Sequence, residues 1–164
     1  MPGLTTGTTA PPLQLATTTG ERLSLADALA DGPVLLAFFK VSCPTCQFTF
    51  PFLERMYQQF RKERVHIWGI VQDKARDGAR FASTYGLTFP ILADESPYQV
   101  SRAYSLRVVP TLLLLKPGGQ IETITEGFCK ADLLNIQKSL AQSLSATPAA
   151  LFLPNERIPE YKPG

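Results

Sequence analysis

The sequence feature that most constrains the fold is an uninterrupted apolar run, residues 34 to 39, followed four residues later by the motif Cys43-Pro-Thr-Cys46. The run reads VLLAFF and has no polar alternation, which is typical of a strand buried on both faces in an α/β sheet. Apolar side chains at helical spacing follow the second cysteine, so residues 47 to 61 are predicted to form a helix. The two cysteines are therefore expected where a central strand ends and a helix begins.

This junction favours thiol chemistry. The unpaired backbone N–H groups and the positive end of the helix dipole stabilise an anion, so the thiolate form of Cys43 is favoured there, and the thiolate is the nucleophile. Pro44 fits the first helical position, because its missing N–H would have no intrahelical partner at that point.

Composition indicates one ordinary globular domain. A chain of 164 residues with 45% hydrophobic and 18% charged residues is long and apolar enough to bury a substantial core. The net charge of +2, with its basic residues scattered, provides no strong field for nucleic acid or an anionic membrane, so neither is expected as a partner. Three cysteines are too few for a disulfide scaffold.

The first ten residues contain neither a basic segment nor an apolar run of the kind found in secretory signals. Nowhere does the sequence approach the ~18 consecutive apolar residues of a bilayer-spanning helix. The expectation from the sequence is a cytoplasmic protein.

Periodicity and turn signals predict the remaining elements. Residues 1 to 12 are expected to form a loose arm, and residues 13 to 144 the domain. Within the domain, alternation or short apolar runs predict strands, and periodic segments predict helices. The expected strands are 13–16, 21–25, 65–71, 89–92, 111–115 and 120–126; the expected helices are 24–30, 73–85, 97–104 and 130–144. Strands 34–39 and 65–71 should be parallel, because a helix connects them, whereas the last two strands form a hairpin.

A Pro-rich tail, residues 145 to 164, follows the last predicted helix. It contains the apolar cluster Leu151-Phe-Leu153, which would be unfavourable if left exposed to water. We expect the cluster to dock on the domain as an extended strap. The alternative is a partner-binding segment that becomes ordered only in a complex.

Several motifs together resemble the thioredoxin superfamily. They are Cys43-Pro-Thr-Cys46 after an apolar strand, Val109-Pro110-Thr111 before another, the turn Lys116-Pro-Gly-Gly and Gly127 before the last helix. The segment from residue 67 to residue 94 is similar to the redoxin branch, which contains the thiol-disulfide oxidoreductases that mature cytochromes c and the alkyl hydroperoxide reductase type of peroxiredoxin. The resemblance covers about residues 11 to 143. It implies a thioredoxin-like α/β fold: a central mixed β-sheet flanked by helices, with an N-terminal hairpin and a central αβ insertion.

The resemblance also implies roles for individual residues. Cys43 would attack a substrate disulfide, and Cys46 would resolve the resulting mixed disulfide. Pro110 matches the family's cis-proline, which turns the backbone of Val109 toward a substrate groove, and Gly127 and Phe128 match the flank of that groove. The expected partners are protein disulfide or dithiol substrates and an upstream reductase. We expect no cofactor, no metal and a monomer.

Three positions depart from the family pattern. Ala37 stands where thioredoxins carry a buried Asp, and Thr49 stands where the cytochrome-maturation relatives carry a Glu. Ser42 replaces the Trp that commonly precedes the first cysteine. No internal carboxylate is then evident to accept the proton of Cys46, which leaves water, the substrate or another group for that role.

Other readings of the cysteines remain open. A zinc half-site lacks a second ligand pair, since Cys129 stands alone and His66 is the only histidine. A peroxidase would need a Pro-x-x-x-Thr/Ser-x-x-Cys arrangement. Leu36 and Lys40 occupy those positions relative to Cys43, and Phe39 and Cys43 occupy them relative to Cys46. A non-catalytic adaptor built on the redoxin scaffold is a third possibility.

Overall fold

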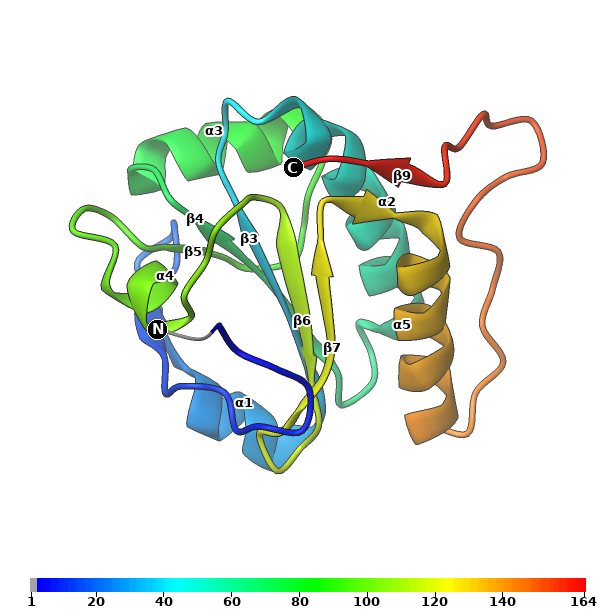
Figure 1. Ribbon diagram of the computed structural model, residues 1–164, viewed down its shortest axis with the longest axis horizontal. Coiled ribbons are helices and arrows are strands. Elements are labelled where there is room, and N and C mark those ends of the chain that lie inside the picture. Colours follow the sequence, from blue (N-terminus) through cyan, green and yellow to red (C-terminus); the bar gives the residue numbers. More distant parts are fainter. Residues whose placement is uncertain (1–2) are drawn as a thin grey trace.

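The computed structural model describes residues 3–164, so residues 1 and 2 of the expected arm lie outside the described part of the chain. A central five-stranded sheet has the strand order β5-β4-β3-β6-β7 (Figure 1). β4 is parallel to β3 and β5 to β4, whereas β6 and β7 continue the sheet in antiparallel pairs. This arrangement confirms the predicted mixed α/β sheet. The strands are β3 (Val34–Phe39), β4 (His66–Val71), β5 (Ile91–Ala93), β6 (Thr111–Leu115) and β7 (Ile121–Glu126).

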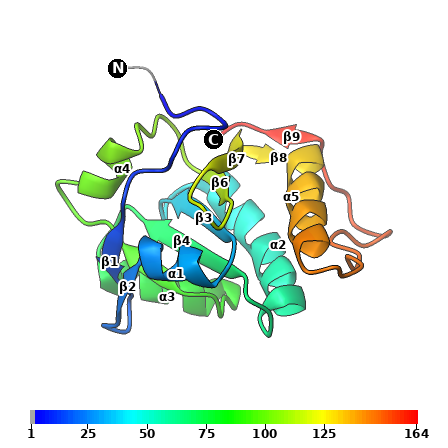
Figure 2. The ribbon, with the colours of Figure 1, turned by 90° about the horizontal axis from the view of Figure 1, so that it is seen from below.

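Strand β3 is buried along its whole length, as its apolar sequence predicts. Alternate side chains point to opposite faces of a strand, so each face of the sheet has its own core. Leu35 and Phe39 pack under α2 (Pro44–Phe60), α3 (Ala75–Tyr85) and α5 (Lys130–Ser143). On the other face, Leu36 and Phe38 join a core with residues of α1 (Leu25–Asp31) and with Tyr104, which follows α4 (Gln99–Ala103). α2 and α5 lie side by side in Figures 1 and 2.

The N-terminal hairpin also forms as predicted. β1 (Gln14–Ala16) pairs with β2 (Arg22–Ser24) in antiparallel register. The turn of this hairpin reaches the edge of the main sheet, where Thr17 forms an isolated bridge with Leu92 of β5. Ser24 then caps α1, because its hydroxyl accepts a hydrogen bond from the backbone N–H of Asp27 at 3.2 Å.

The N-terminal arm is not loose, contrary to the prediction from its composition. Gly7 N–H donates to the Ile121 carbonyl at 2.8 Å, and Ala10 N–H donates to the Gly119 carbonyl at 2.9 Å. Ala10 is only 8% exposed. The arm is held because the backbone groups of the turn before β7 form hydrogen bonds with this Thr- and Gly-rich segment. Backbone pairing does not require apolar residues at regular spacing, so the sequence pattern did not predict it.

An aromatic cluster lies directly beneath the dithiol. The ring of Phe39, the last residue of β3, lies 4.3 Å from that of Phe50 and 4.8 Å from that of Phe81 between centroids. Gly69 on β4 leaves room for these rings: a Cβ atom there would lie 3.2 Å from a ring carbon of Phe39 and 2.7 Å from the side chain of Ile91. The end of β3 is therefore packed tightly just before the chain turns into α2.

The C-terminal tail is docked on the domain. We call residues 149–158 the strap. Leu151 is 2% exposed, and the ring of Phe152 lies 5.0 Å from that of Phe52 on α2. Arg55 donates to both carboxylate oxygens of Glu156 at 2.6 Å and to the Leu151 carbonyl at 3.1 Å. The structure confirms docking for Leu151 and Phe152 but not for Leu153, which is 47% exposed.

The tail ends in a strand that the sequence analysis did not predict. β9 (Tyr161–Lys162) pairs antiparallel with β8 (Phe128–Cys129), a two-residue strand that immediately precedes α5 (Figure 2). The last residues of the chain therefore lie near the start of α2 (Figure 1).

Replacing Leu151 with Ala should destabilise the protein by roughly 2 to 3 kcal/mol, because it removes a buried side chain and leaves a cavity that the strap can close only in part. Urea denaturation measures this difference. Leu153→Ala is the matched control, since Leu153 lies two residues away and is largely exposed; its free energy of unfolding should change by less than about 0.5 kcal/mol. Equal losses in the two variants would contradict docking through Leu151.

Acid should loosen the strap through Glu156. The hydrogen bonds from Arg55, together with one from the Leu153 N–H, lower the pKa of Glu156 from 4.5 to about 2. Because the pKa is lowered in the folded state, the contribution of Glu156 is present above pH 4.5 and is lost as the pH falls through about 2. The N–H of Leu153 donates to Glu156 Oε1 at 2.8 Å. The protection factor of this amide, meaning its exchange rate relative to the intrinsic rate at the same pH, should fall over this range. In Glu156→Gln this pH dependence should be absent.

Candidate active site

Cys43 is the residue at which β3 gives way to α2, and its side chain caps the helix. Its backbone is extended, and its sulfur accepts a hydrogen bond of 3.1 Å from the backbone N–H of Cys46. Pro44 occupies the first turn, as predicted. Cys43 is partly exposed, so its sulfur lies at the surface with the N-terminal end of α2 directed at it.

Cys46 lies one turn further along α2 and is fully buried. Burial raises the pKa of its thiol above the ordinary value of 9.0, and the hydrogen bond with the Cys43 side chain raises it further, while the backbone of Lys40 acts in the opposite direction. Cys46 is consequently a protonated thiol at neutral pH. One cysteine is thus accessible and capped by a helix, and the other is shielded and neutral.

Two side chains fix the loop that leads into the dithiol. The carboxylate of Asp73 accepts a hydrogen bond of 2.9 Å from the backbone N–H of Val41. Gln47 donates from its amide to the Val41 carbonyl, also at 2.9 Å. The sequence analysis gave neither residue a role. The position of Asp73 could have been predicted from the sequence. Asp73 follows β4, which is parallel to β3, so the carboxyl ends of both strands meet at the same edge of the sheet.

The segment containing Pro110 lies opposite the dithiol. The Val109–Pro110 peptide bond is cis, and the thiol of Cys43 donates to the Val109 carbonyl at 3.5 Å. Gly127, whose φ of +78° favours glycine, donates from its N–H to the Pro110 carbonyl at 2.8 Å. The structure therefore brings together Cys43, Val109, Pro110 and Gly127.

The side chain and the backbone of Phe128 have different surroundings. Its side chain is fully buried, and its ring lies 5.0 Å from that of Phe48 on α2. Its backbone pairs with Lys162 of β9.

The positions that depart from the family pattern provide no carboxylate. Ala37 is fully buried in β3, and Thr49 is buried with its hydroxyl donating to the Thr45 carbonyl at 2.7 Å. Ser42 is exposed beside Cys43. These side chains fill or line the site without adding a base close to Cys46.

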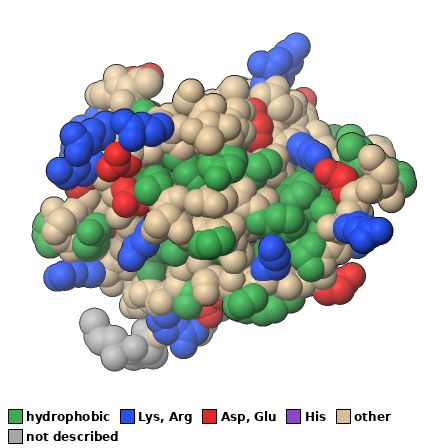
Figure 3. Space-filling model, turned by 90° about the horizontal axis from the view of Figure 1, so that it is seen from above, with side chains coloured by type: hydrophobic (Ala, Val, Ile, Leu, Met, Phe, Trp, Pro, Cys, Tyr) green, Lys and Arg blue, Asp and Glu red, His purple; other side chains and the backbone are tan. Residues whose placement is uncertain are grey.

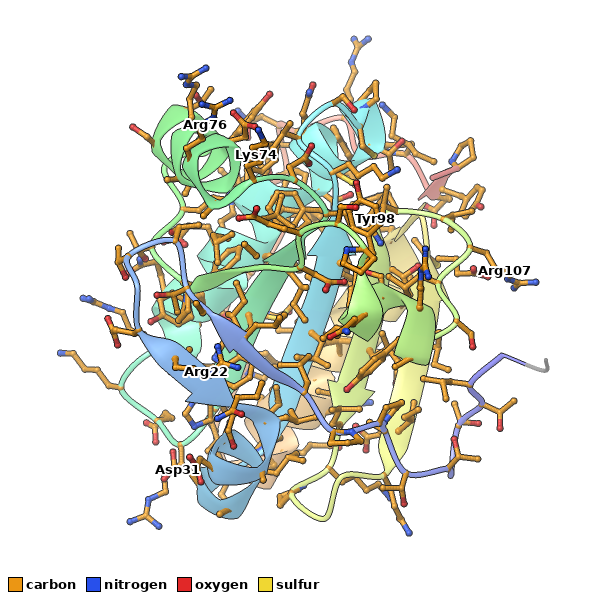
Figure 4. All side chains as sticks on the ribbon, turned by 90° about the vertical axis from the view of Figure 1, so that its left-hand side faces the viewer. Arg22, Asp31, Lys74, Arg76, Tyr98 and Arg107 are labelled. Carbon is orange, nitrogen blue, oxygen red and sulfur yellow. The ribbon has the colours of Figure 1, made fainter. Side chains whose placement is uncertain are left out.

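His66 lies away from the dithiol. It begins β4, and its ring nitrogen Nε2 lies 2.8 Å from a carboxylate oxygen of Asp31. Figure 4 shows Asp31 next to α1, on the opposite side of the view from Lys74 and Arg76. A cavity of about 680 Å³ is lined by both residues, by the β1–β2 hairpin and by Trp68, and it does not include Cys43 or Cys46. Within residues 3–164, no three His, Cys, Asp or Glu side chains gather in a way that could hold a metal ion.

The face of the molecule seen from above in Figure 3 corresponds to the upper end of Figure 1, where β3 gives way to α2. Hydrophobic side chains gather toward the middle of this face, with Lys, Arg, Asp and Glu side chains spread around them (Figure 3). An apolar surface with a mixed charged rim is typical of a site that contacts another protein.

A dithiol at the start of a helix, a cis-proline segment facing it and a mixed sheet behind both define a redoxin of the thioredoxin superfamily. A family model agrees: the AhpC/TSA family matches residues 6–124. The chain belongs to the AhpC/TSA family.

Curated relatives and solved structures are consistent with this assignment. The chain is 30% identical over 122 residues to the thiol-disulfide oxidoreductase ResA of Bacillus subtilis, covering 74% of this chain and 67% of that relative. It is 32% identical over 122 residues to ResA of Geobacillus kaustophilus, covering 74% and 69%. Among solved structures, a thiol:disulfide interchange protein DsbE from Chlorobium tepidum matches the fold with a TM-score of 0.76 at 24% identity, covering 87% of this chain and 99% of that one.

The different environments of the two cysteines predict selective alkylation. Iodoacetamide should modify Cys43 long before Cys46 at neutral pH, because Cys46 is buried and its raised pKa keeps it protonated. Peptide mapping by mass spectrometry after timed quenching measures the two rates, and unfolding the protein in urea should abolish the difference. Faster modification of Cys46 in the folded protein would reverse the assignment of the two thiols.

Proposed function

We propose that this protein is a thiol-disulfide oxidoreductase that exchanges disulfides with protein substrates through Cys43 and Cys46. The observation that carries the proposal is the pairing of an accessible, helix-capping sulfur with a buried thiol one turn behind it. The relatedness to ResA, which is named as a thiol-disulfide oxidoreductase, supports the same activity.

In the first step of the proposed reaction, the Cys43 thiolate attacks one sulfur of a substrate disulfide. A bond forms between Cys43 and that sulfur, the substrate S–S bond breaks, and the other substrate sulfur leaves as a thiolate. The N–H of Cys46, 3.1 Å from the Cys43 sulfur, stabilises the attacking anion.

In the second step Cys46 attacks the Cys43 sulfur and releases the remaining substrate thiol. Two electrons pass from the dithiol to the substrate, which leaves a Cys43–Cys46 disulfide and a substrate dithiol. The proton of Cys46 must leave before or during the attack, and the departing substrate thiolate is a base of suitable strength to accept it. The reverse sequence of steps oxidises a substrate dithiol, so the same site serves either direction.

The substrate groove is proposed to run along Val109, Pro110, Gly127 and Phe128. Support comes from the contact between the Cys43 thiol and the Val109 carbonyl and from the hydrogen bond between Gly127 and Pro110. An extended substrate segment would pair with backbone groups there, as in other cases of strand addition. Phe128 would contribute its backbone, since its side chain is buried.

The partners of the reaction are proposed in part from relatives. Protein thiols are the substrate class implied by the thiol-disulfide oxidoreductase relatives. Three further points stay predictions. Pull-down with a trapped variant would test for an upstream reductase, and size-exclusion chromatography would test the monomeric state. Cell fractionation would test the cytoplasmic location. None of the helices within residues 3–164 is both long and apolar enough to span a membrane.

A trapping experiment tests the proposal. In Cys46→Ser, Cys43 should attack a disulfide of oxidised insulin, and the mixed disulfide should not be resolved. The adduct with one insulin chain should therefore accumulate and disappear on adding dithiothreitol. Cys43→Ser should form no such adduct and should lose insulin-reductase activity. Cys129→Ser is the control for the third thiol and should retain both turnover and, combined with Cys46→Ser, trapping.

Other outcomes point to the alternatives. Rapid consumption of hydrogen peroxide without insulin reduction would favour a peroxidase. A protein whose Cys43 is reactive toward alkylating reagents but forms no mixed disulfide with protein or glutathione would favour the adaptor.

A further inference from the structure

The last residues of the chain lie in the groove assigned above to the substrate. β9 adds an antiparallel strand to β8, with Lys162 opposite Phe128 and Tyr161 opposite Cys129. The strand is introduced by a hydrogen bond of 3.0 Å from the Lys130 N–H to the Glu160 carbonyl. The backbone of Phe128 is therefore already paired.

The residues after β9 continue toward the sulfur of Cys43. The hydroxyl of Thr45, between the two cysteines, donates to the Pro163 carbonyl at 2.6 Å. A Cβ atom placed on Gly164 would lie only 2.5 Å from the Val109 carbonyl oxygen, the same oxygen that the Cys43 thiol contacts. A Cβ atom placed on Gly127 would lie 2.5 Å from the Lys162 carbonyl oxygen. Residues 160–164 thus contact three sides of the site: the motif, the segment before Pro110 and the flank at Gly127.

We propose that residues 160–164 act as an internal competitor, an extended segment of the chain that occupies the substrate groove and must leave before a protein disulfide can reach Cys43. This inference rests on the proposed function, because it takes the groove to be the place where substrate binds. It further specifies the substrate as an extended segment that pairs antiparallel with residues 128–129 and offers a carbonyl to Thr45.

The tail is divided into a firmly held part and a loosely held part. The strap is fixed by the buried Leu151, by Phe152 and by the Arg55–Glu156 ion pair. Residues 160–164 are held instead by backbone hydrogen bonds, by the Thr45 hydroxyl and by two side-chain contacts. The ammonium of Lys162 lies 4.5 Å from the centre of the Phe48 ring, and the largely exposed carboxylate of Glu160 lies 3.9 Å from Lys130 Nζ. Tyr161 is 58% exposed. Most of the hydrogen bonds use backbone groups of the tail, so an extended substrate segment can make the same hydrogen bonds.

The strap keeps residues 160–164 close to the groove without fixing them in it. A segment tethered by a short linker has an effective concentration in the millimolar range, so it outcompetes a dilute substrate even when its own affinity is weak. A groove open for only a fraction of the time weakens the apparent affinity for substrate by that fraction. The tail therefore lowers the apparent affinity for every substrate by the same factor.

Truncation after Pro159 is the direct test, since it removes the competitor and retains the strap. If the groove is open about one-tenth of the time, kcat/KM for insulin reduction should rise roughly tenfold. The rate at which a bulky maleimide modifies Cys43 should rise in the same variant. That second readout needs no turnover, so it tests the tail even if the protein reduces no disulfide.

A point variant avoids the risk that truncation disturbs folding. Lys162→Glu removes the contact with Phe48 and should raise both rates roughly two- to fivefold, in line with the strength of one partly exposed cation–π contact. Lys138→Glu is the matched control: it makes the same charge change at an exposed position on α5 and should leave both rates unchanged.

Adding the segment back as a peptide completes the test. An acetylated peptide of residues 158–164 should inhibit the truncated protein competitively with insulin. The same peptide with Glu in place of Lys162 should inhibit roughly two- to fivefold less strongly, because it lacks the contact with Phe48. Unchanged maleimide rates in the truncated protein and in Lys162→Glu would overturn the proposal. A folded truncated protein with lower kcat/KM would also overturn it, because the tail would then be a wall of the groove that substrates need. Faster maleimide modification without any insulin reduction would sustain the shielding by the tail and refute the proposed function instead.

Discussion

In the first turn of α2 the backbone N–H of Cys46 donates a hydrogen bond to the Cys43 sulfur, and the position of both groups depends on β3. That strand is buried on both faces, so its course through the molecule is fixed by two separate cores. The Phe39, Phe50 and Phe81 rings lock its last residue. Asp73 then accepts a hydrogen bond from the Val41 N–H, and Gln47 donates one to the Val41 carbonyl. The loop that carries Cys43 therefore has little conformational freedom.

The absence of a carboxylate at Ala37 and Thr49 has a chemical consequence. Cys46 is buried among apolar side chains and its pKa is raised by that burial, so forming its thiolate is unfavourable as long as the site is closed. In the mixed disulfide, the Cys43 sulfur is no longer available to share a hydrogen bond with it, and a substrate thiolate is released close by. In the proposed reaction this substrate thiolate would accept the proton of Cys46, so release of the reduced substrate would depend on the basicity of its thiol.

The sequence was sufficient for the features that depend on periodicity. The uniform apolar run at 34–39, the helix start at Pro44 and the end of a helix at residue 85 all depend on local sequence, and the structure confirms each. The features it did not reveal depend on pairing between distant segments. Asp73 holds Val41 across two strands, and the N-terminal arm pairs with the turn before β7. Backbone pairing of this kind is indifferent to side-chain type, so it leaves almost no pattern in either partner.

The tail shows the same limit most clearly. Leu151 could be recognised as an anchor because burying a large apolar side chain stabilises by about 1.5 to 3 kcal/mol and cannot be replaced by water. Residues 160–164 carry no such mark: Glu, Tyr, Lys, Pro and Gly are ordinary surface residues. They nevertheless pair with β8 because a two-residue strand beside a helix has an open edge, and an open edge accepts any extended chain that is held near it. Leu151 thus keeps the tail close to β8, and the open edge of β8 determines how the tail pairs with it. A substrate can displace the tail only because these two requirements are met by different residues.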